Sequence, residues 1–263
     1  MYAFTFERPS TTADAGKLLT GGAKALAGGQ TLLASMKLRL ANPETLVDLG
    51  NVSELSGIRR DGDNIVIGAM TRHADVATNA EVLASIPALA DLAGHIGDKQ
   101  VRAMGTIGGS LANNDPAACY PSAVLALNAT VHTTQRKIAA DDFFQSMFTT
   151  ALNDGELITA VSFPITRHAA YMKFRQPASR FALIGVFVAK TVQGVRVAVT
   201  GGGQGVFRHK GLEEALTRSF TPEAAAAVKI DSAGLSADMH ASADYRANLI
   251  SVMTQRAVTK ALG

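Results

Sequence analysis

Two glycine-rich turns, about 80 residues apart, constrain the fold of this chain more than any other feature. The first lies in LAGGQTLLASMKLR at Leu26–Arg39 and the second in GTIGGSLANNDPAACYP at Gly105–Pro121. Each places adjacent glycines where a strand should pass into a helix or a loop, so backbone N–H groups can approach a phosphate with no Cβ in the way. Two such turns predict a diphosphate held from both sides.

Neither turn follows the common nucleotide-binding patterns. A Rossmann site would show G-x-G-x-x-G at the start of a βαβ unit, and a P-loop would show G-x-x-x-x-G-K-[ST]; the sequence contains neither. The predicted diphosphate site therefore belongs to another type of fold.

The length and composition indicate a globular chain of more than one subdomain. With 263 residues, 47% of them hydrophobic, the chain can bury a full core and exceeds the usual size of a single domain. The net charge of +3 is spread along the chain without a basic run, and there is no Trp, which argues against nucleic-acid binding. Only 18% of the residues are charged, and such a surface suits contact with partner subunits.

The single cysteine, Cys119, limits the metal and redox chemistry of the chain. One sulfur cannot form an internal disulfide, a Cys-based zinc site or an iron–sulfur cluster held by this chain alone. The six histidines lack metal-ligand spacing, so no metal site is predicted. No G-x-S-x-G elbow is present and Cys119 has no helical His partner, so no catalytic residue is predicted and hydrolysis is disfavoured.

The sequence also predicts a soluble, cytoplasmic protein. Its first residues, MYAFTFERPS, lack the basic and apolar regions of a signal peptide. The longest strongly apolar run, Ala182–Ala189, is too short to cross a bilayer, so no membrane span is expected.

Apolar periodicity predicts three successive units. In the first, residues 2–6, 24–27 and 45–49 are expected as strands and residues 11–19 and 31–40 as helices, with Leu40 on the apolar side of the second helix. In the second, a hairpin turns at Asp61–Asn64, Thr71 caps a short helix, Pro87 opens a longer helix, and another helix follows Pro121. Strands at residues 130–134 and 157–164 complete this unit.

The third unit combines antiparallel strands with helices. Phe181–Thr191 and Val195–Thr200 read as a hairpin, and three helices start near Leu212, Thr221 and Ser242. The last helix is expected to run to Leu262 with one side toward the core, formed by Tyr245, Leu249, Val252 and Met253. We divide the chain into residues 1–55, 56–166 and 167–263.

Three further segments, added to the two turns, give the sequence a family resemblance. They are KFRQPASRFALIGV at Lys173–Val186, VAVTGGG at Val197–Gly203 and DMHASADYR at Asp238–Arg246. In their order and spacing the chain resembles, over essentially its whole length, the FAD-binding medium subunit of the molybdenum hydroxylases, the family of xanthine dehydrogenase and carbon monoxide dehydrogenase.

The resemblance implies an α+β fold: a vanillyl-alcohol-oxidase-type (PCMH-type) FAD-binding fold of two α/β subdomains, followed by a small C-terminal α/β domain with antiparallel strands and helices. FAD would be bound non-covalently between the first two parts. A large molybdenum–pterin subunit and a small subunit with two [2Fe-2S] clusters would be the partners, in a dimer of heterotrimers. Electrons would pass from those clusters through FAD to a soluble acceptor.

Two other functions compete with this interpretation. One is a free-standing FAD-dependent oxidoreductase of the same fold that acts directly on an organic substrate. The other is a non-enzymatic diphosphate-binding or scaffold protein, for which the sequence offers only the glycine turns.

Carried over by position, the resemblance also implies the FAD-binding residues. Lys173 would lie near the isoalloxazine ring, where a cation stabilises the anionic reduced flavin; in isolation, a solvated lysine on a strand edge would be the simpler interpretation. Asp115 could accept hydrogen bonds from ribityl or ribose hydroxyls, or could simply start the turn at Pro116. Many relatives carry an acidic FAD contact where this chain has Cys119, and no role is assigned to Ala103 and Met104. The full predicted set is Leu26, Ala27, Gly28, Gly29, Gln30, Thr31, Leu32, Leu33, Ile96, Thr106, Ile107, Gly108, Gly109, Ser110, Asp115, Cys119, Ile158 and Lys173.

Overall fold

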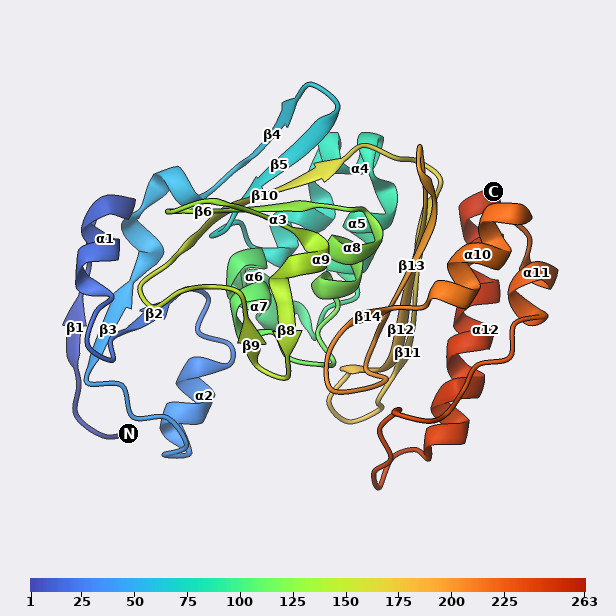
Figure 1. Cartoon of the computed structure of the whole chain (residues 1–263). Helices are drawn as coiled ribbons and strands as arrows, with labels where there is room; N and C mark the ends of the chain where they lie inside the picture. Colours follow the sequence, from blue (N-terminus) through green and yellow to red (C-terminus); the bar gives the residue numbers. More distant parts are fainter.

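The computed structural model describes residues 1–263 and arranges three main β-sheets one after another along the chain (Figure 1). The predicted boundaries at residues 55/56 and 166/167 each fall between two of these sheets. No helix combines the length and apolar character that a membrane crossing requires.

The first sheet is small and parallel. It has the strand order β1-β3-β2, with helices in the two crossovers that parallel strands require. Thr11 caps α1 by accepting a hydrogen bond from the Asp14 N–H. The elements are β1 (Thr5–Glu7), α1 (Thr12–Leu18), β2 (Lys24–Leu26), α2 (Leu32–Lys37) and β3 (Thr45–Asp48), followed by the 3₁₀ turns η1 (Leu49–Asn51) and η2 (Ser53–Leu55).

The second sheet is antiparallel and has the order β4-β5-β10-β6-β7. Its strands and helices contribute most of the largest hydrophobic core. The strands are β4 (Ile58–Asp61), β5 (Asn64–Gly68), β6 (Thr130–Thr133), β7 (Lys137–Ala139) and β10 (Ile158–Pro164), with a separate hairpin of β8 (Phe144–Ser146) and β9 (Thr149–Thr150). The helices are α3 (His73–Thr78), α4 (Ala80–Ser85), α5 (Pro87–Gly94), α6 (Lys99–Met104), α7 (Ile107–Asn113), α8 (Tyr120–Ala126) and α9 (Ala140–Phe143).

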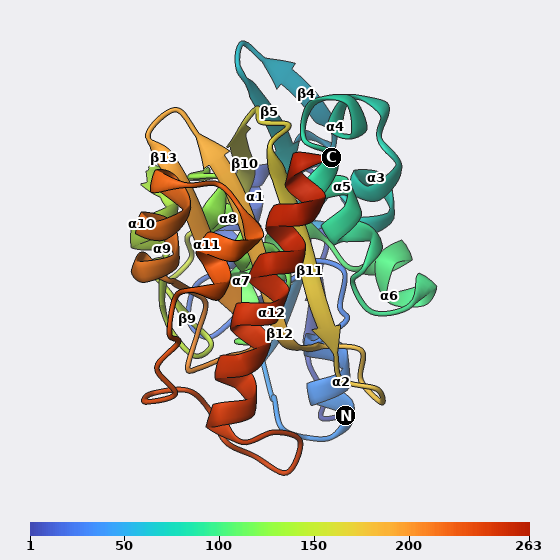
Figure 2. The same cartoon turned by 90° about the vertical axis from the view of Figure 1, so that its right-hand side faces the viewer.

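The third sheet stands between the second unit and the C-terminal helices (Figures 1 and 2). The run Ala182–Ala189 is buried throughout, because α12 covers the sheet on one side while α5 and α8 pack against the other. The strand order β11-β12-β13-β14 is antiparallel. The elements are β11 (Ala169–Arg175), β12 (Ala182–Thr191), β13 (Gly194–Thr200), β14 (Phe207–Arg208), α10 (Lys210–Arg218), α11 (Pro222–Ala226) and α12 (Ala243–Leu262).

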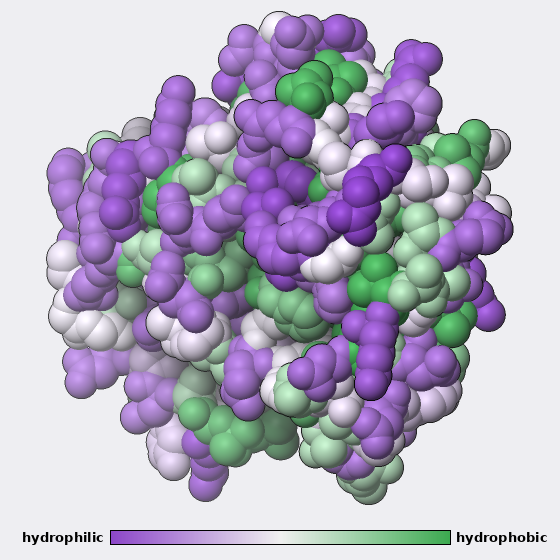
Figure 3. All heavy atoms as spheres, turned by 45° about the vertical axis from the view of Figure 1, so that its right-hand side comes forward, coloured by the Kyte–Doolittle hydropathy of each residue, from purple (hydrophilic) through white to green (hydrophobic).

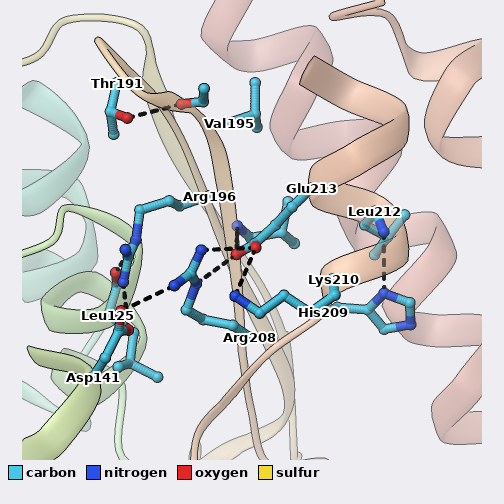
Figure 4. Close-up of polar contacts among 12 residues, drawn as sticks. Leu125, Asp141, Thr191, Val195, Arg196, Arg208, His209, Lys210, Leu212 and Glu213 are labelled. Carbon is cyan, nitrogen blue, oxygen red and sulfur yellow. Dashed lines mark hydrogen bonds and ion pairs between the residues drawn. The ribbon is translucent and has the colours of Figure 1, made fainter. Parts of the chain in front are cut away.

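A network of charged side chains fastens the third sheet to the second unit (Figure 4). Asp141 on α9 accepts hydrogen bonds from Arg196 at 2.5 Å and from Arg208 at 3.0 Å. Arg196 also donates to the Leu125 carbonyl at 2.8 Å, and Arg208 pairs with Glu213 at 2.7 Å. Burial alone would raise the pKa of Glu213, but the hydrogen bonds from Arg208 and from a backbone N–H outweigh burial and lower that pKa.

Three details of the predicted elements are wrong. Helix α2 ends at Lys37 instead of residue 40, because Arg39 takes a left-handed conformation at φ 61°, and Leu40 is 79% exposed. Thr71 does not cap α3, since Arg72 holds that position and the Thr71 hydroxyl donates to the Gly57 carbonyl. Tyr245 is 42% exposed instead of facing the core.

Candidate FAD site

The two glycine turns meet at the junction of the first and second units. A Cβ on Gly28 would lie 2.2 Å from the Met104 carbonyl oxygen and 2.7 Å from the Gly105 Cα. A Cβ on Gly109 would lie 3.5 Å from the Cβ of Ala27. Only glycine allows the two backbones to approach this closely, so the fold brings together the two segments expected to hold the diphosphate.

The first turn offers unused backbone donors. Strand β2 ends at Leu26 and α2 begins at Leu32, and the N–H groups of Gly28, Gly29, Gln30 and Thr31 donate to no acceptor within the protein. Gly29 has φ +70°. The Thr31 side chain makes no capping hydrogen bond, so it does not compete for these donors. A run of free, partly exposed N–H groups is the arrangement that binds phosphate oxygens.

The second turn uses its N–H groups inside the protein. Ile107 donates to the Thr71 carbonyl at 3.1 Å, and Gly108 donates to the Ala69 carbonyl at 2.8 Å. Gly109 and Ser110 both donate to Thr106. A Cβ on Gly108 would lie 2.6 Å from the Cβ of Ala69, so this glycine is needed for packing at the end of β5. The two turns therefore differ: the first presents donors, and the second supports it.

A lysine from the third sheet reaches the second unit. Lys173 on β11 donates to the His95 carbonyl oxygen at 3.1 Å, and its Nζ lies 3.3 Å from the Cys119 sulfur. Ile96 directly follows His95 and is half-buried. The structure thus gathers Ile96, Cys119 and Lys173, three residues of the predicted set that are far apart in the sequence.

Two other residues of the predicted set have defined positions. Asp115 accepts a hydrogen bond from the Ala117 N–H at 2.8 Å, the geometry of a side chain that starts a turn. Ile158 begins β10 and is buried; the neighbouring Thr159 carbonyl accepts a hydrogen bond from Ala69, which also contacts the second turn. Ile158 is therefore beside that turn and away from the solvent.

The VAVTGGG segment holds the chain that leads to Cys119. The Thr200 hydroxyl oxygen lies 2.8 Å from the Pro116 carbonyl oxygen and 2.7 Å from that of Ala118, so its single O–H can donate to either, and the Gly201 N–H donates to the Pro116 carbonyl at 2.8 Å. Two segments recognised by resemblance, those of Lys173 and Thr200, thus contact the segment of the second glycine turn that runs from Pro116 to Cys119.

A buried histidine that was not among the predicted site residues supports the second turn. His73 is 4% exposed, and its backbone N–H donates to the Gly105 carbonyl at 2.9 Å. The centre of its ring lies 5.3 Å from the centre of the Tyr120 ring. Burial, helped by the nearby Arg102 charge, lowers the pKa of His73 to about 4, so the imidazole is neutral at pH 7. The supporting role of His73 is visible only in the folded structure, because a single histidine forms no recognisable sequence pattern.

Two cavities, of about 640 and 500 Å³, lie elsewhere in the molecule, and neither is lined by a residue of Leu26–Leu33 or Thr106–Ser110. No group of three or more His, Cys, Asp or Glu side chains is arranged to hold a metal ion. The candidate FAD site is the junction where the two turns meet.

Comparison with known proteins identifies the family. Residues 2–166 match the family described as the FAD binding domain in molybdopterin dehydrogenase. The chain is 36% identical to the carbon monoxide dehydrogenase medium chain of Afipia carboxidovorans, over 98% of this chain and 96% of that protein. It is 32% identical to the glyceraldehyde dehydrogenase medium chain of Sulfolobus acidocaldarius, over 97% and 96%.

Solved structures agree with the sequence matches. A carbon monoxide dehydrogenase from Hydrogenophaga pseudoflava, in a form that lacks the Mo-pyranopterin moiety, aligns with a TM-score of 0.90 at 33% identity, covering 99% of this chain and 98% of that chain. Quinoline 2-oxidoreductase from Pseudomonas putida 86 aligns with a TM-score of 0.91 at 30% identity, covering 99% and 97%. The fold class, the FAD cofactor and the family predicted from the sequence are confirmed. This chain belongs to the FAD-binding medium subunits of the molybdenum hydroxylases.

Proposed function

We propose that the chain binds one FAD non-covalently at the junction of its first two units and transfers electrons within a heterotrimeric molybdenum hydroxylase. The observation that carries this proposal is the meeting of the two glycine turns, with four free N–H groups at Gly28–Thr31. When bound, FAD supplies the redox chemistry, and the protein binds it, orients it and adjusts its potential.

The residues divide this work by position. The first turn, Leu26–Leu33, holds the diphosphate oxygens through its free N–H groups, and Thr106–Ser110 supports it from the second unit. Ile96, Cys119 and Lys173 form the isoalloxazine end. Asp115 stabilises the turn that leads to Cys119 by accepting a hydrogen bond from the Ala117 N–H. Ile158 is buried beside the second turn.

The partners follow from the relatives. Medium chains of carbon monoxide dehydrogenases imply a large and a small companion subunit. The single, buried Cys119 leaves iron–sulfur clusters to another chain. We place the molybdenum–pterin in the large partner and two [2Fe-2S] clusters in the small one, with electrons leaving the flavin for a soluble acceptor. The proposed assembly is a cytoplasmic dimer of heterotrimers.

Thr31 offers a direct test of the diphosphate site. It is exposed, occupies the N-cap of α2 and makes no capping bond, so Thr31→Asp can cap the helix while placing a carboxylate among the free N–H groups. We expect FAD to bind at least tenfold more weakly to Thr31→Asp than to Thr31→Asn, which caps equally without charge, with both variants folded. Isothermal titration of the two apo variants with FAD measures this. Equal affinities of the two variants for FAD would show that the phosphate groups do not bind at this turn.

A further inference from the structure

Lys173 contacts a carbonyl oxygen and a sulfur atom, and no carboxylate. Its Nζ contacts the His95 carbonyl oxygen at 3.1 Å and the Cys119 sulfur at 3.3 Å, and no carboxylate lies within ion-pair distance of it. Asp91, the acidic residue next to this region, pairs with Lys260 at 2.9 Å and with His95 Nδ1 at 3.5 Å. The positive charge of Lys173 therefore has no carboxylate counter-ion.

Cys119 and the hydroxyl of its neighbour Tyr171 are both buried. Cys119 is 5% exposed, and the buried Tyr171 hydroxyl beside it has no hydrogen-bond partner. Burial, followed by the proximity of Cys119, raises the pKa of Tyr171 well above its usual value, so the phenol is neutral. Gly185 pairs with Lys173 across the sheet, and a Cβ there would lie 2.5 Å from the Tyr171 hydroxyl. The sheet is thus built to keep the tyrosine in this position.

We propose that Cys119 is a positioning residue that fixes the Lys173 ammonium group without neutralising it. A carboxylate at this position would form a salt bridge with Lys173 and cancel most of its field at the flavin. A sulfur atom orients the lysine and leaves its charge available to the flavin, where it favours the reduced, anionic form. This inference rests on the proposed FAD site.

The test compares flavin reduction in four FAD-loaded full-length variants. Cys119→Asp neutralises Lys173 and Cys119→Ala releases it, and both should lower the equilibrium constant for two-electron reduction against a reference dye. For Cys119→Asp we expect at least tenfold, equivalent to about 30 mV. Cys119→Ser keeps a neutral contact and should stay within threefold of the unmodified chain. Val192→Asp is the charge control, since it is fully exposed and beyond the end of the strand that pairs with Lys173, roughly 20 Å away.

A second measurement needs no flavin. In the apo chain, an amine-acylating reagent followed by peptide mass spectrometry gives the modification rate of Lys173, which Cys119→Asp should slow at least threefold relative to Cys119→Ser. A higher flavin potential in Cys119→Ser than in the unmodified chain would overturn the proposal, because Cys119 would then be the counter-ion. Unchanged reduction in both Cys119→Asp and Cys119→Ala would overturn it as well. If the chain binds no FAD but shows the difference in acylation rate, the proposed function would be refuted, while the contact between Cys119 and Lys173 would still stand.

Discussion

At the scale of single residues, similar glycine pairs perform different physical tasks. Gly28 and Gly29 belong to a turn with free N–H groups, whereas Gly108 fills a contact with Ala69 that leaves no room for a side chain. The sequence shows where adjacent glycines stand, but it does not show which neighbour faces each missing Cβ. That information depends on the meeting of two units that are far apart along the chain.

The same Gly→Ala change should therefore have opposite effects at two sites. At Gly108 the new Cβ would lie 2.6 Å from the Cβ of Ala69 and 2.8 Å from its carbonyl oxygen, so we expect Gly108→Ala to lower the free energy of unfolding by about 1–3 kcal/mol. At Gly16, inside α1 with no atom within 4 Å of the new Cβ, Gly16→Ala should raise it by about 0.5–1 kcal/mol. Urea titration measures both, and a neutral Gly108→Ala would contradict the close packing at the second turn.

His73 should make folding sensitive to mild acid. Its pKa is lowered from 6.5 to about 4 by burial, so the unfolded chain takes up the proton first as the pH falls. Above pH 6.5 His73 is neutral in both the folded and the unfolded chain, so the free energy of unfolding has its full value. As the pH falls toward 4, up to about 3 kcal/mol of that free energy is lost. Relative to the unmodified chain, His73→Phe should lose less stability between pH 6.5 and 4.5. Parallel pH profiles of the unfolding free energy for the two proteins would show that His73 does not carry this dependence.

At the scale of elements, the sequence predicted best where periodicity and caps act locally. The helix that begins after Thr11 and the strands at Thr45–Asp48 and Ala182–Thr191 follow from alternation, apolar runs and capping alone. Helix α6 at Lys99–Met104 was missed because it has no buried residue and so no apolar pattern. The end of α2 was misplaced because Arg39 takes the left-handed conformation that ends a helix, with the Leu40 N–H donating to the Ser35 carbonyl, and an arginine does not mark such an end in the sequence as a glycine would.

The link between α9 and the third sheet gives a prediction at this scale. Asp141 is the shared acceptor of Arg196, whose side chain is 10% exposed, and of Arg208. Removing it leaves a largely buried guanidinium without its partner, so Asp141→Ala should lower the free energy of unfolding by roughly 2 kcal/mol. The adjacent Asp142 is exposed and its side chain forms no hydrogen bond, so Asp142→Ala should change it by less than about 0.5 kcal/mol. Equal effects of the two substitutions would mean that the network adds no stability.

At the scale of the whole molecule, the three sheets separate the tasks that the proposed function combines. The first two units supply the turns, and the third sheet delivers Lys173 and Thr200 to the same region. The sequence located the two turns from their glycines and the other three segments through resemblance, yet the convergence of Lys173 and Thr200 on this region depends on the packing of β11 and β13 against α5 and α8. Figure 3 shows that polar residues cover most of the side that carries the third unit, with hydrophobic residues in separate patches.

The proposed assembly predicts the composition of the native protein. The chain has one buried cysteine and no metal-binding cluster, so iron and molybdenum must come from other subunits if it works in a molybdenum hydroxylase. Purification from the native source should yield two additional chains, with molybdenum and iron in fixed proportion to FAD. The isolated chain should hydroxylate no substrate, while its flavin still accepts electrons from a chemical reductant. Elemental analysis of the FAD-containing fractions measures the ratio, and a native protein that runs alone, free of both metals, and oxidises an organic substrate would establish the free-standing flavoenzyme instead.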